Sequence, residues 1–526
     1  MRHLLHRPTR CLIVQSKFSD FSFWNYIDVC RLVGAKYPAA PLGLMTVAGL
    51  LPQEWEFKLV DENVEPLLDS HLQWAEIVCC GGMLPQQAGI QAVIRRVHQF
   101  GKKVIVGGPD PTSQPEMYTE ADFLVLGEGE VTLPMMLADW EAGRHSPRYQ
   151  SPDQADMTRS VLPRFDLIRF EDYLHVGIQY SRGCPFNCEF CDIIELYGRV
   201  PRSKTAGQVI AELQRLHDLG YRGHVDFVDD NLIGNKKSLK IALPIIHQWM
   251  AEHSFPFFFS TEASINLVSD EPLMKMMQAL DFRYLFIGIE TPEDEVLRQT
   301  QKKQNCKVSI KEAIRKIGGY GMIVNAGFIL GFDTEGKLSA RHMIDCIQDS
   351  GVCMAMVGLL TALPNTQLTR RLATEGRLAA QGVQISDAGQ IDQTTSGLNF
   401  TTRRPRIEIL QDYLKIIESV YHPKNYYDRV LLTARQLRIA NKHKPPFRKI
   451  LNMARAFGRL CWAVSRDREI RRHYWSMFFR VLFGSPRSIE AAVNLGAMYL
   501  HFHKQSGYLK RLMTTQIADL ELSRAA

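Results

Sequence analysis

The chain has 526 residues, of which 45% are hydrophobic and 23% charged, and its formal net charge is +7. This composition is ordinary for a globular protein and excludes a disordered, collagen-like or disulfide-scaffold chain. The length predicts three or four domains, at about 150 residues each. The eleven cysteines are irregularly spaced, and no apolar run approaches the ~18 residues of a membrane-spanning helix. We therefore expect a cytoplasmic protein with reduced thiols.

The first 150 residues alternate short β-branched runs with helical stretches. Strands are expected at 11–15, 58–61, 77–81, 104–107 and 123–127, with helical spacing at 43–51 and 88–100. This rhythm predicts a doubly wound, Rossmann-like parallel sheet with helices on both faces. Ligands of such sheets bind at the carboxyl ends of the strands. The polar stretch 151–176, which contains Pro152 and Pro163, is expected to be a linker.

The strand and helix alternation resumes at Gly177. Strands are expected at 177–181, 224–228, 257–261, 284–289, 324–330 and 354–360. Six strands with helices between them predict a partial or full βα barrel, whose active residues follow the strands. Near residue 400 the alternation stops, and the remaining sequence is helical and rich in arginine.

A cysteine motif follows the first of these later strands. It reads Ser181-Arg-Gly-Cys184-Pro-Phe-Asn-Cys188-Glu-Phe-Cys191, a C-x3-C-x2-C spacing. A 4Fe–4S cluster normally takes four cysteines, so three thiolates leave one iron open to a substrate or cofactor. Zinc usually needs a fourth ligand and paired spacings, and no companion pair lies nearby. A zinc site and three chance cysteines are therefore the disfavoured alternatives.

The motif, with Phe190 as its aromatic residue, resembles the signature of the radical S-adenosylmethionine (SAM) enzymes. In that family the open iron chelates SAM, and electron transfer produces a 5′-deoxyadenosyl radical. The resemblance covers roughly 177–365 and implies cluster ligation by Cys184, Cys188 and Cys191. It implies SAM contacts at Phe190, Asp229, Asp230, Glu262, Glu290 and Gly327. A helix N-cap is the alternative role for either aspartate, and a structural salt bridge is the alternative for Glu262.

The N-terminal region resembles the cobalamin-binding domain of the cobalamin-dependent members of this family. The resemblance implies cobalamin contacts at Pro41, Gly43, Asn63, Gly81, Gly82, Gly107, Gly108, Gly127, Glu128 and Gly129. Where some cobalamin domains carry a cobalt-ligating histidine, the stretch 61–66 has none, so the lower cobalt ligand is unassigned. A nucleotide-binding domain is the rival interpretation, but no G-x-G-x-x-G follows the first strand.

Residues 421–480 carry the excess positive charge. They hold 15 basic and 3 acidic side chains, a net +12, so the rest of the chain carries −5. Aromatic residues are interspersed among these basic side chains, which is typical of a helix facing anionic lipid. A solvated basic face over an ordinary core is the alternative, and we expect no nucleic acid partner. The stretch 489–502 has helical apolar spacing and is expected to belong to a core or to a cap.

These features together predict an α/β protein. The expected domains are a cobalamin-binding domain at 1–150, a linker at 151–176, a radical SAM barrel at 177–400 and a basic helical domain at 401–526. This order resembles hopanoid methylases and bacteriochlorophyll side-chain methylases, which act on large apolar molecules. The resemblance implies a methyltransferase acting on an unactivated carbon of a hopanoid-, isoprenoid- or tetrapyrrole-like substrate. It also implies a flavodoxin- or ferredoxin-like electron donor and permits peripheral membrane contact through 421–480.

Three alternatives stay open at this point. A relative of this kind can use SAM and cobalamin for a non-methylating cyclization or rearrangement. A tRNA methylthiotransferase would need an additional N-terminal cluster, and Cys11, Cys30, Cys79 and Cys80 lack the expected spread. A non-catalytic cobalamin or redox sensor is the third.

Overall fold

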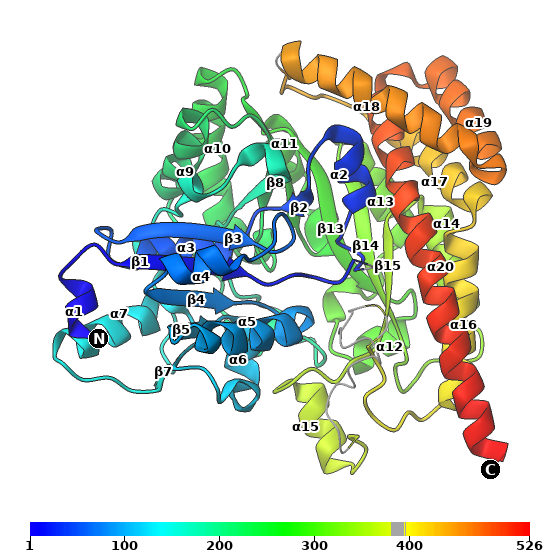
Figure 1. The fold of residues 1–526 in the computed structure, drawn as a ribbon. Coiled ribbons are helices and arrows are strands. Elements are labelled where there is room, and N and C mark those ends of the chain that lie inside the picture. The colour runs from blue at the N-terminus through cyan, green and yellow to red at the C-terminus, as the bar shows by residue number, and fades with distance from the viewer. Residues whose placement is uncertain (21, 380–393, 395, 446, 526) are drawn as a thin grey trace.

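The protein combines two parallel sheets with a block of C-terminal helices (Figure 1). The computed structural model describes residues 1–20, 22–379, 394, 396–445 and 447–525. Within these residues one large sheet has six strands and the other has seven, and neighbouring strands in both are parallel. The predicted α/β class is confirmed.

The N-terminal sheet has the strand order β3-β1-β4-β5-β6-β7. Its strands are β1 (Arg10–Gln15), β3 (Glu56–Asp61), β4 (Ile77–Gly81), β5 (Lys103–Gly107), β6 (Phe123–Leu126) and β7 (Arg148–Gln150). The helices around it are α1 (Arg2–Leu5), α3 (Leu42–Leu50), α4 (Asp69–Trp74), α5 (Gln87–Gln99), α6 (Pro109–Ser113) and α7 (Gly129–Glu141). All five predicted strands are present, and β7 is an edge strand that the sequence pattern did not reveal.

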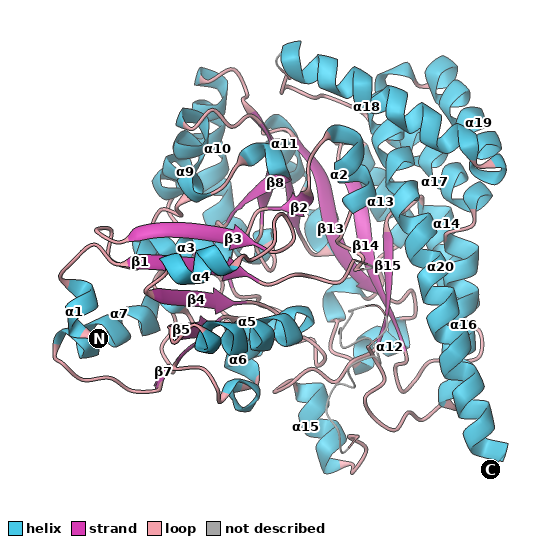
Figure 2. Ribbon diagram, in the orientation of Figure 1, coloured by secondary structure: helices cyan, strands magenta, loops and turns pink. Residues whose placement is uncertain are grey.

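The strand order explains where this sheet binds a ligand. All five residues of β4 are buried, as expected for a strand covered by helices on both faces. From β1 the chain moves to β3 on one side and then returns to β4 on the other, so the winding direction reverses between β1 and β4. Ligands of doubly wound sheets bind beyond the carboxyl ends of the strands at such a switch point. Figure 2 shows these ends directed toward the second sheet.

The second sheet is an open barrel wall with the order β15-β14-β13-β12-β11-β8-β2. Its strands are β2 (Tyr37–Ala39), β8 (Tyr173–Ile178), β11 (Gly223–Phe227), β12 (Phe257–Glu262), β13 (Phe282–Glu290), β14 (Ile323–Leu330) and β15 (Ala355–Leu359), and β9 (Ser181–Arg182) and β10 (Arg202–Ser203) form a small ribbon. The helices between them are α8 (Ile193–Leu196), α9 (Ala206–Asp218), α10 (Lys236–Glu252), α11 (Glu271–Ala279), α12 (Asp294–Gln299), α13 (Ile310–Gly318), α14 (Ser339–Ser350) and α15 (Gln367–Thr374).

The six predicted barrel strands are present, with two differences at the edge. The strand expected at 177–181 begins earlier, at Tyr173, so the last residues of the expected linker belong to β8. Tyr37–Ala39, which lies within the expected N-terminal domain and outside its expected strands, forms β2 and pairs with β8. Strand pairing between segments more than 130 residues apart leaves no local signal, so the sequence could not reveal this edge.

Aromatic side chains from outside the sheet contact the barrel wall at its β15 edge and on its inner face. Along β15, the hydroxyls of Tyr413 and Tyr421 donate to the carbonyls of Val357 and Ala355 at 3.2 and 2.6 Å. These bonds satisfy edge groups that would otherwise invite pairing with another chain. On the inner face of the wall, the ring of Trp24 lies 5.1 Å from that of Phe286 on β13, the third strand from the β15 edge. The N-terminal segment therefore lines part of the barrel interior.

The C-terminal region is helical, as predicted. Its helices are α16 (Arg406–Val420), α17 (Pro423–Gln436), α18 (Phe447–Arg466), α19 (Arg468–Gly484) and α20 (Ile489–Ala525). They also contact the start of the chain through α2 (Ile27–Val33), which packs on α18 and α20. Among the described residues, no helix is long and apolar enough to span a membrane.

Candidate functional site

The three motif cysteines lie on one tight loop at the carboxyl end of the barrel. The loop leaves β9 through Gly183, whose φ of +93° and whose crowding against the carbonyl of Gly198 favour glycine. Cys184 N donates back to Gly198 O at 3.2 Å, and Cys191 N donates to Cys188 O at 3.2 Å. These bonds fold the loop so that all three thiols belong to one compact turn.

The protein around the motif cysteines disfavours free thiolates but provides amide donors to two of the sulfurs. Burial raises the pKa of Cys184 and Cys191, and the nearby Cys188 raises both further. Asn231 Nδ2 lies 3.8 Å from Cys184 Sγ, and Gln304 Nε2 lies 3.6 Å from Cys188 Sγ. Amide donors of this kind stabilise sulfur ligands of iron–sulfur clusters.

The donor set fits a cluster better than a single ion. In the part of the chain that the structure describes, no three His, Cys, Asp or Glu side chains are arranged for one metal ion. A cluster, which is several atoms wide, requires more widely spaced thiolates than one ion does. The three motif cysteines would hold a 4Fe–4S cluster, and the amides of Asn231 and Gln304 would donate to its sulfur ligands.

Asp229 fastens the cysteine loop to the barrel. Its carboxylate accepts hydrogen bonds from Tyr180 N at 3.0 Å, from Ser181 Oγ at 2.6 Å and from Ser181 N. Burial raises its pKa to about 7. Asp230 accepts from Gly183 N at 2.8 Å, and burial raises its pKa to about 6. Both aspartates therefore position the cysteine loop by accepting hydrogen bonds from its backbone. The sequence analysis considered only SAM binding and helix capping for them.

Glu290 forms a buried ion pair with a lysine that the sequence pattern did not single out. Lys302 Nζ lies 2.6 Å from Glu290 Oε1 and 5.8 Å from the ring centroid of Phe190. Burial opposes the charge of Lys302, but Glu290 and Cys188 together raise its pKa. A Cβ at Gly288 would collide with the Glu290 carboxylate. A positive charge is therefore held beside the cysteines.

Glu262 and Gly327 line the inner face of the barrel wall. Glu262 is solvent-accessible at the end of β12, but the enclosing protein, together with Asp226 and Asp230, raises its pKa to about 8. It forms no ion pair among the described residues, so the alternative of a structural salt bridge is not observed. A Cβ at Gly327 would lie 3.1 Å from the ring of Phe286, so the glycine makes room for that ring.

A polar cluster lies deeper on the same inner face and escaped the sequence analysis. The Ser260 hydroxyl donates its hydrogen to Asp226, and its oxygen lies 2.6 Å from His224 Nε2. His224 must therefore be protonated at Nε2 to donate to this oxygen. The rings of His175 and His224 are 5.0 Å apart. Among the described residues, the buried Tyr26 hydroxyl and His175 Nδ1 have no hydrogen-bond partner. Unpaired buried polar atoms call for water or a ligand. The polar residues at alternate positions of β11 were the available signal.

The predicted cobalamin residues surround the carboxyl edge of the N-terminal sheet. A Cβ at Gly81, Gly107 or Gly108 would crowd neighbouring backbone, so these glycines let the strand ends pack closely. A Cβ at Gly82 would instead meet the Gln86 side chain, whereas Gly43 has open space around it. Three further predicted residues are Pro41 before α3, Gly127 with a φ of +83°, and Gly129 at the start of α7.

Asn63 and Ser16 mark the loops that follow β3 and β1. Asn63 accepts from Phe18 N at 2.8 Å and donates to Asp61 Oδ1 at 2.7 Å, so its amide joins the two loops. The Ser16 hydroxyl, beside the switch point, is buried without a partner among the described residues. An edge free of bulky side chains with a buried, unpaired hydroxyl fits a large planar cofactor such as cobalamin. Individual contacts to it stay predictions.

Ion pairs join the carboxyl end of the N-terminal sheet to the small ribbon of β9 and β10 beside the cysteine loop. Arg182, two residues before Cys184, binds Glu128 at 2.6 Å and Glu130 at 2.9 Å. Arg202 also binds Glu128, at 2.8 Å. The Glu128 side chain thus contacts the barrel. We refer to these ion pairs as the Arg182 latch. They hold the cysteine loop against the edge predicted for cobalamin, so both predicted cofactor sites border one region.

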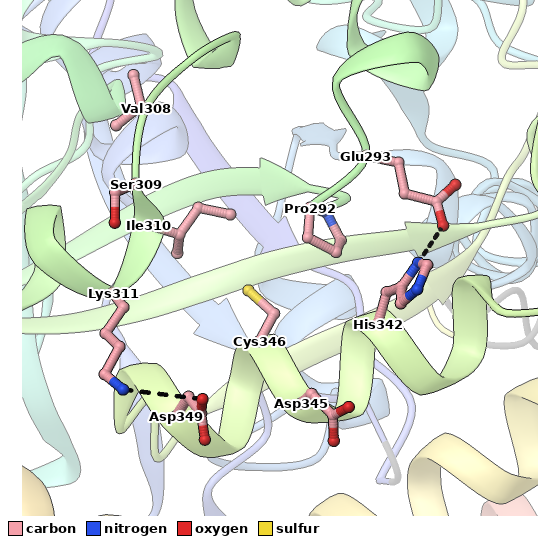
Figure 3. A pocket seen from close by; sticks show the side chains of 10 residues that line it. All are labelled: Pro292, Glu293, Val308, Ser309, Ile310, Lys311, His342, Asp345, Cys346 and Asp349. Carbon is pink, nitrogen blue, oxygen red and sulfur yellow. Dashed lines mark hydrogen bonds and ion pairs between the residues drawn. The ribbon is translucent and has the colours of Figure 1, made fainter.

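A surface cleft of about 420 Å³ lies elsewhere, between the loop after β13 and helix α14 (Figure 3). Its lining includes Cys346 and the pair Glu293–His342, with 2.9 Å between the carboxylate and the imidazole. None of the predicted site residues lines it. The cleft is therefore separate from the candidate site.

Family comparisons agree with the order of these sites. The model of the B12 binding domain matches residues 30–137, and that of the radical SAM superfamily matches residues 178–347. A third model, a domain of unknown function (DUF4070), matches residues 366–513. The domain boundaries given above stay predictions.

Two relatives and one solved structure resemble the chain along most of its length. An uncharacterized methyltransferase, sll1242, of Synechocystis is 38% identical over 514 residues, covering 97% of this chain and 94% of the relative. The hopanoid C-2 methylase of Rhodopseudomonas palustris is 38% identical over 342 residues, covering 64% of this chain and 65% of the methylase.

The solved structure is that of the radical SAM methyltransferase TsrM of Kitasatospora setae with cobalamin and a 4Fe–4S cluster bound. It aligns with a TM-score of 0.62 at 14% identity, covering 86% of this chain and all of that one, and it supports the fold. With both family models matched and 38% identity along 97% of its length, the chain belongs to the cobalamin-dependent radical SAM enzymes, whose cofactors are a 4Fe–4S cluster, SAM and cobalamin.

Proposed function

We propose that this radical SAM methyltransferase methylates an unactivated carbon of a large apolar substrate of the hopanoid, isoprenoid or tetrapyrrole type. The observation that carries the proposal is the Arg182 latch to Glu128 and Glu130, which holds the cysteine loop against the edge predicted for cobalamin. The 38% identity to a hopanoid C-2 methylase supports an apolar substrate. When bound, the cluster, SAM and cobalamin supply electron transfer, the adenosyl radical and the methyl group.

The chain's own residues position these groups and shield them. The motif cysteines would hold the cluster, with Asn231 and Gln304 donating to their sulfurs. Lys302 places a positive charge beside them. The electron that the cluster needs would come from a flavodoxin- or ferredoxin-like protein.

The inner face of the barrel suits a substrate that is mostly apolar. Trp24 and Phe286 provide aromatic wall, and the ring of Tyr284 lies 5.9 Å from that of His224. The polar cluster around Asp226 would accept one hydrogen-bonding group of such a molecule. Peripheral membrane contact within 421–480 would let the enzyme collect a substrate that is insoluble in water.

Product analysis tests the reaction type. With anaerobically reconstituted protein, a reductant, SAM and a hopanoid extract, we expect S-adenosylhomocysteine and 5′-deoxyadenosine in about equal amounts, because methyl transfer consumes one SAM for each route. A methylated hopanoid should accumulate with them. Cys346→Ala, in the separate cleft, is the matched control and should behave like the natural protein.

Other product patterns would contradict methyl transfer. 5′-Deoxyadenosine without S-adenosylhomocysteine would indicate a cyclization or rearrangement. Neither product, from protein with a full complement of iron, would indicate a sensor. Lipid profiles of a deletion strain provide an independent check, because the methylated substrate should disappear from them.

A further inference from the structure

The basic and aromatic segment 421–480 divides into a buried part and an exposed part. Tyr426, Tyr427 and Arg429, all on α17, are at most 2% exposed. The Arg429 guanidinium donates to Val420 O and Gln348 Oε1, each at 2.8 Å, so this cation belongs to the core. Among the described residues of the segment, the exposed large apolar side chains lie beyond α17, on α18 and α19.

Helix α18 exposes an apolar stripe. Phe447 is 80% exposed and Trp462 is 65% exposed, with the half-exposed Ile450 and Leu451 between them. Spacings of 3, 4 and 11 residues place these four side chains on one face of a helix. The Arg466 guanidinium lies 4.5 Å from the ring centroid of Trp462. The stripe thus combines apolar side chains with a cation stacked on its aromatic residue.

Helix α19 repeats the pattern with its charge at one end. Phe483 is 82% exposed, and its ring lies parallel to that of Phe479, with 6.4 Å between the centroids. One helical face carries these two residues, and its earlier turns carry the exposed Arg468, Arg471 and Arg472. The opposite face is the one that packs in the core, through residues such as Tyr474 and Val481. An apolar patch outside the core is therefore built into both helices.

The two helices form one corner of the molecule. They pack on each other through Phe457 and Phe478, whose ring centroids lie 5.8 Å apart. In Figure 1 this corner lies far from the N-terminal sheet, beside the upper end of α20. Contiguous exposed apolar side chains are rare on monomers unless something covers them.

We propose that the exposed face of α18 and α19 binds the surface of an anionic lipid bilayer. Aromatic and aliphatic side chains flanked by arginines are the composition that helices use at a lipid interface. A second copy of the chain would bring two segments of net +12 together, which charge repulsion opposes. Nucleic acid would match the arginines but leave Ile450, Leu451 and Phe483 without partners. The proposal goes beyond methyl transfer. Its only link to the proposed function is a substrate that resides in lipid.

Vesicle sedimentation of the full chain tests the proposal. We expect binding to vesicles that contain phosphatidylglycerol and weak binding to pure phosphatidylcholine, because each basic residue near an anionic surface adds attraction. Arg471→Glu with Arg472→Glu should weaken binding at least about tenfold. Trp462→Asp with Phe483→Asp should do the same, because a charge replaces each inserted side chain. Ile241→Asp is the matched control, because Ile241 is 70% exposed, a fraction between those of Trp462 and Phe483, but lies on α10.

Several outcomes would overturn the proposal. These are equal binding to both vesicle types, no binding to either, or binding that Ile241→Asp reduces as much as Trp462→Asp with Phe483→Asp. A dimer in solution that Phe483→Asp dissociates would assign the face to a second copy. Displacement of the vesicles by a short DNA duplex, with tighter binding to the duplex, would assign it to nucleic acid. SAM cleavage in solution should be unchanged in all these variants, which separates this proposal from the methyltransferase assignment.

Discussion

Replacing Cys184 by alanine is expected to abolish SAM cleavage. Three cysteines of one loop are the predicted ligands, and the loss of one leaves the cluster with two. Because losses of groups that merely support metal ligands already cost ~10–100-fold, we expect cleavage to fall by more than about a hundredfold. Iron content and the visible absorbance of the reconstituted protein should fall in parallel.

Cys346→Ala is the control for this experiment. Cys346 is a half-buried thiol on α14, and it lines the separate cleft rather than the motif loop. It should retain full iron content and cleavage. Full iron content and SAM cleavage in Cys184→Ala would show that the assignment of the cluster is wrong.

Replacing Asp229 by alanine is expected to destabilise the barrel and weaken cluster retention together. The substitution leaves the buried Tyr180 N–H and Ser181 N–H without their acceptor. Each unsatisfied buried donor costs about 1–3 kcal/mol. The loss should appear as a lower melting temperature by calorimetry and as faster release of iron to a chelator.

Asp229→Asn separates the two roles that have been considered for this side chain. The amide keeps one oxygen as an acceptor, so it should recover part of the melting temperature and of the iron retention. If Asp229 instead acts mainly on SAM, both variants should keep their iron and melting temperature and should raise the KM for SAM. That result would contradict the positioning role.

Local sequence signals predicted the strands and the cysteine loop well. A run such as 77–81 is apolar at every position, which requires burial on both faces and predicts a central parallel strand. The motif cysteines lie within eight residues, so one turn brings them together whatever the rest of the chain does. The glycines around 81–82 and 107–108 marked the strand ends in the same way.

Contacts between distant segments were not predictable. Arg182 and Glu128 are 54 residues apart, and neither has a local feature that names the other as its partner. Lys302, which no sequence motif singled out, lies beside Glu290 in the folded chain. Asp229, which the family resemblance assigned to SAM, accepts a hydrogen bond from the backbone of Tyr180, 49 residues away.

The sequence by itself determined the order of the βα units, the cysteine loop and the charge of 421–480, because each depends on residues that are close in the chain. The tertiary structure alone decided that β2 joins the barrel wall, that Arg182 ties the cysteine loop to Glu128 of the N-terminal region, and that Arg429 is buried while Phe483 is exposed. A helix such as α19 has apolar residues on two faces, and periodicity does not say which face the core will cover. Which face is buried depends on the packing of α19 against α17 and α20, and these contacts exist only in the folded chain.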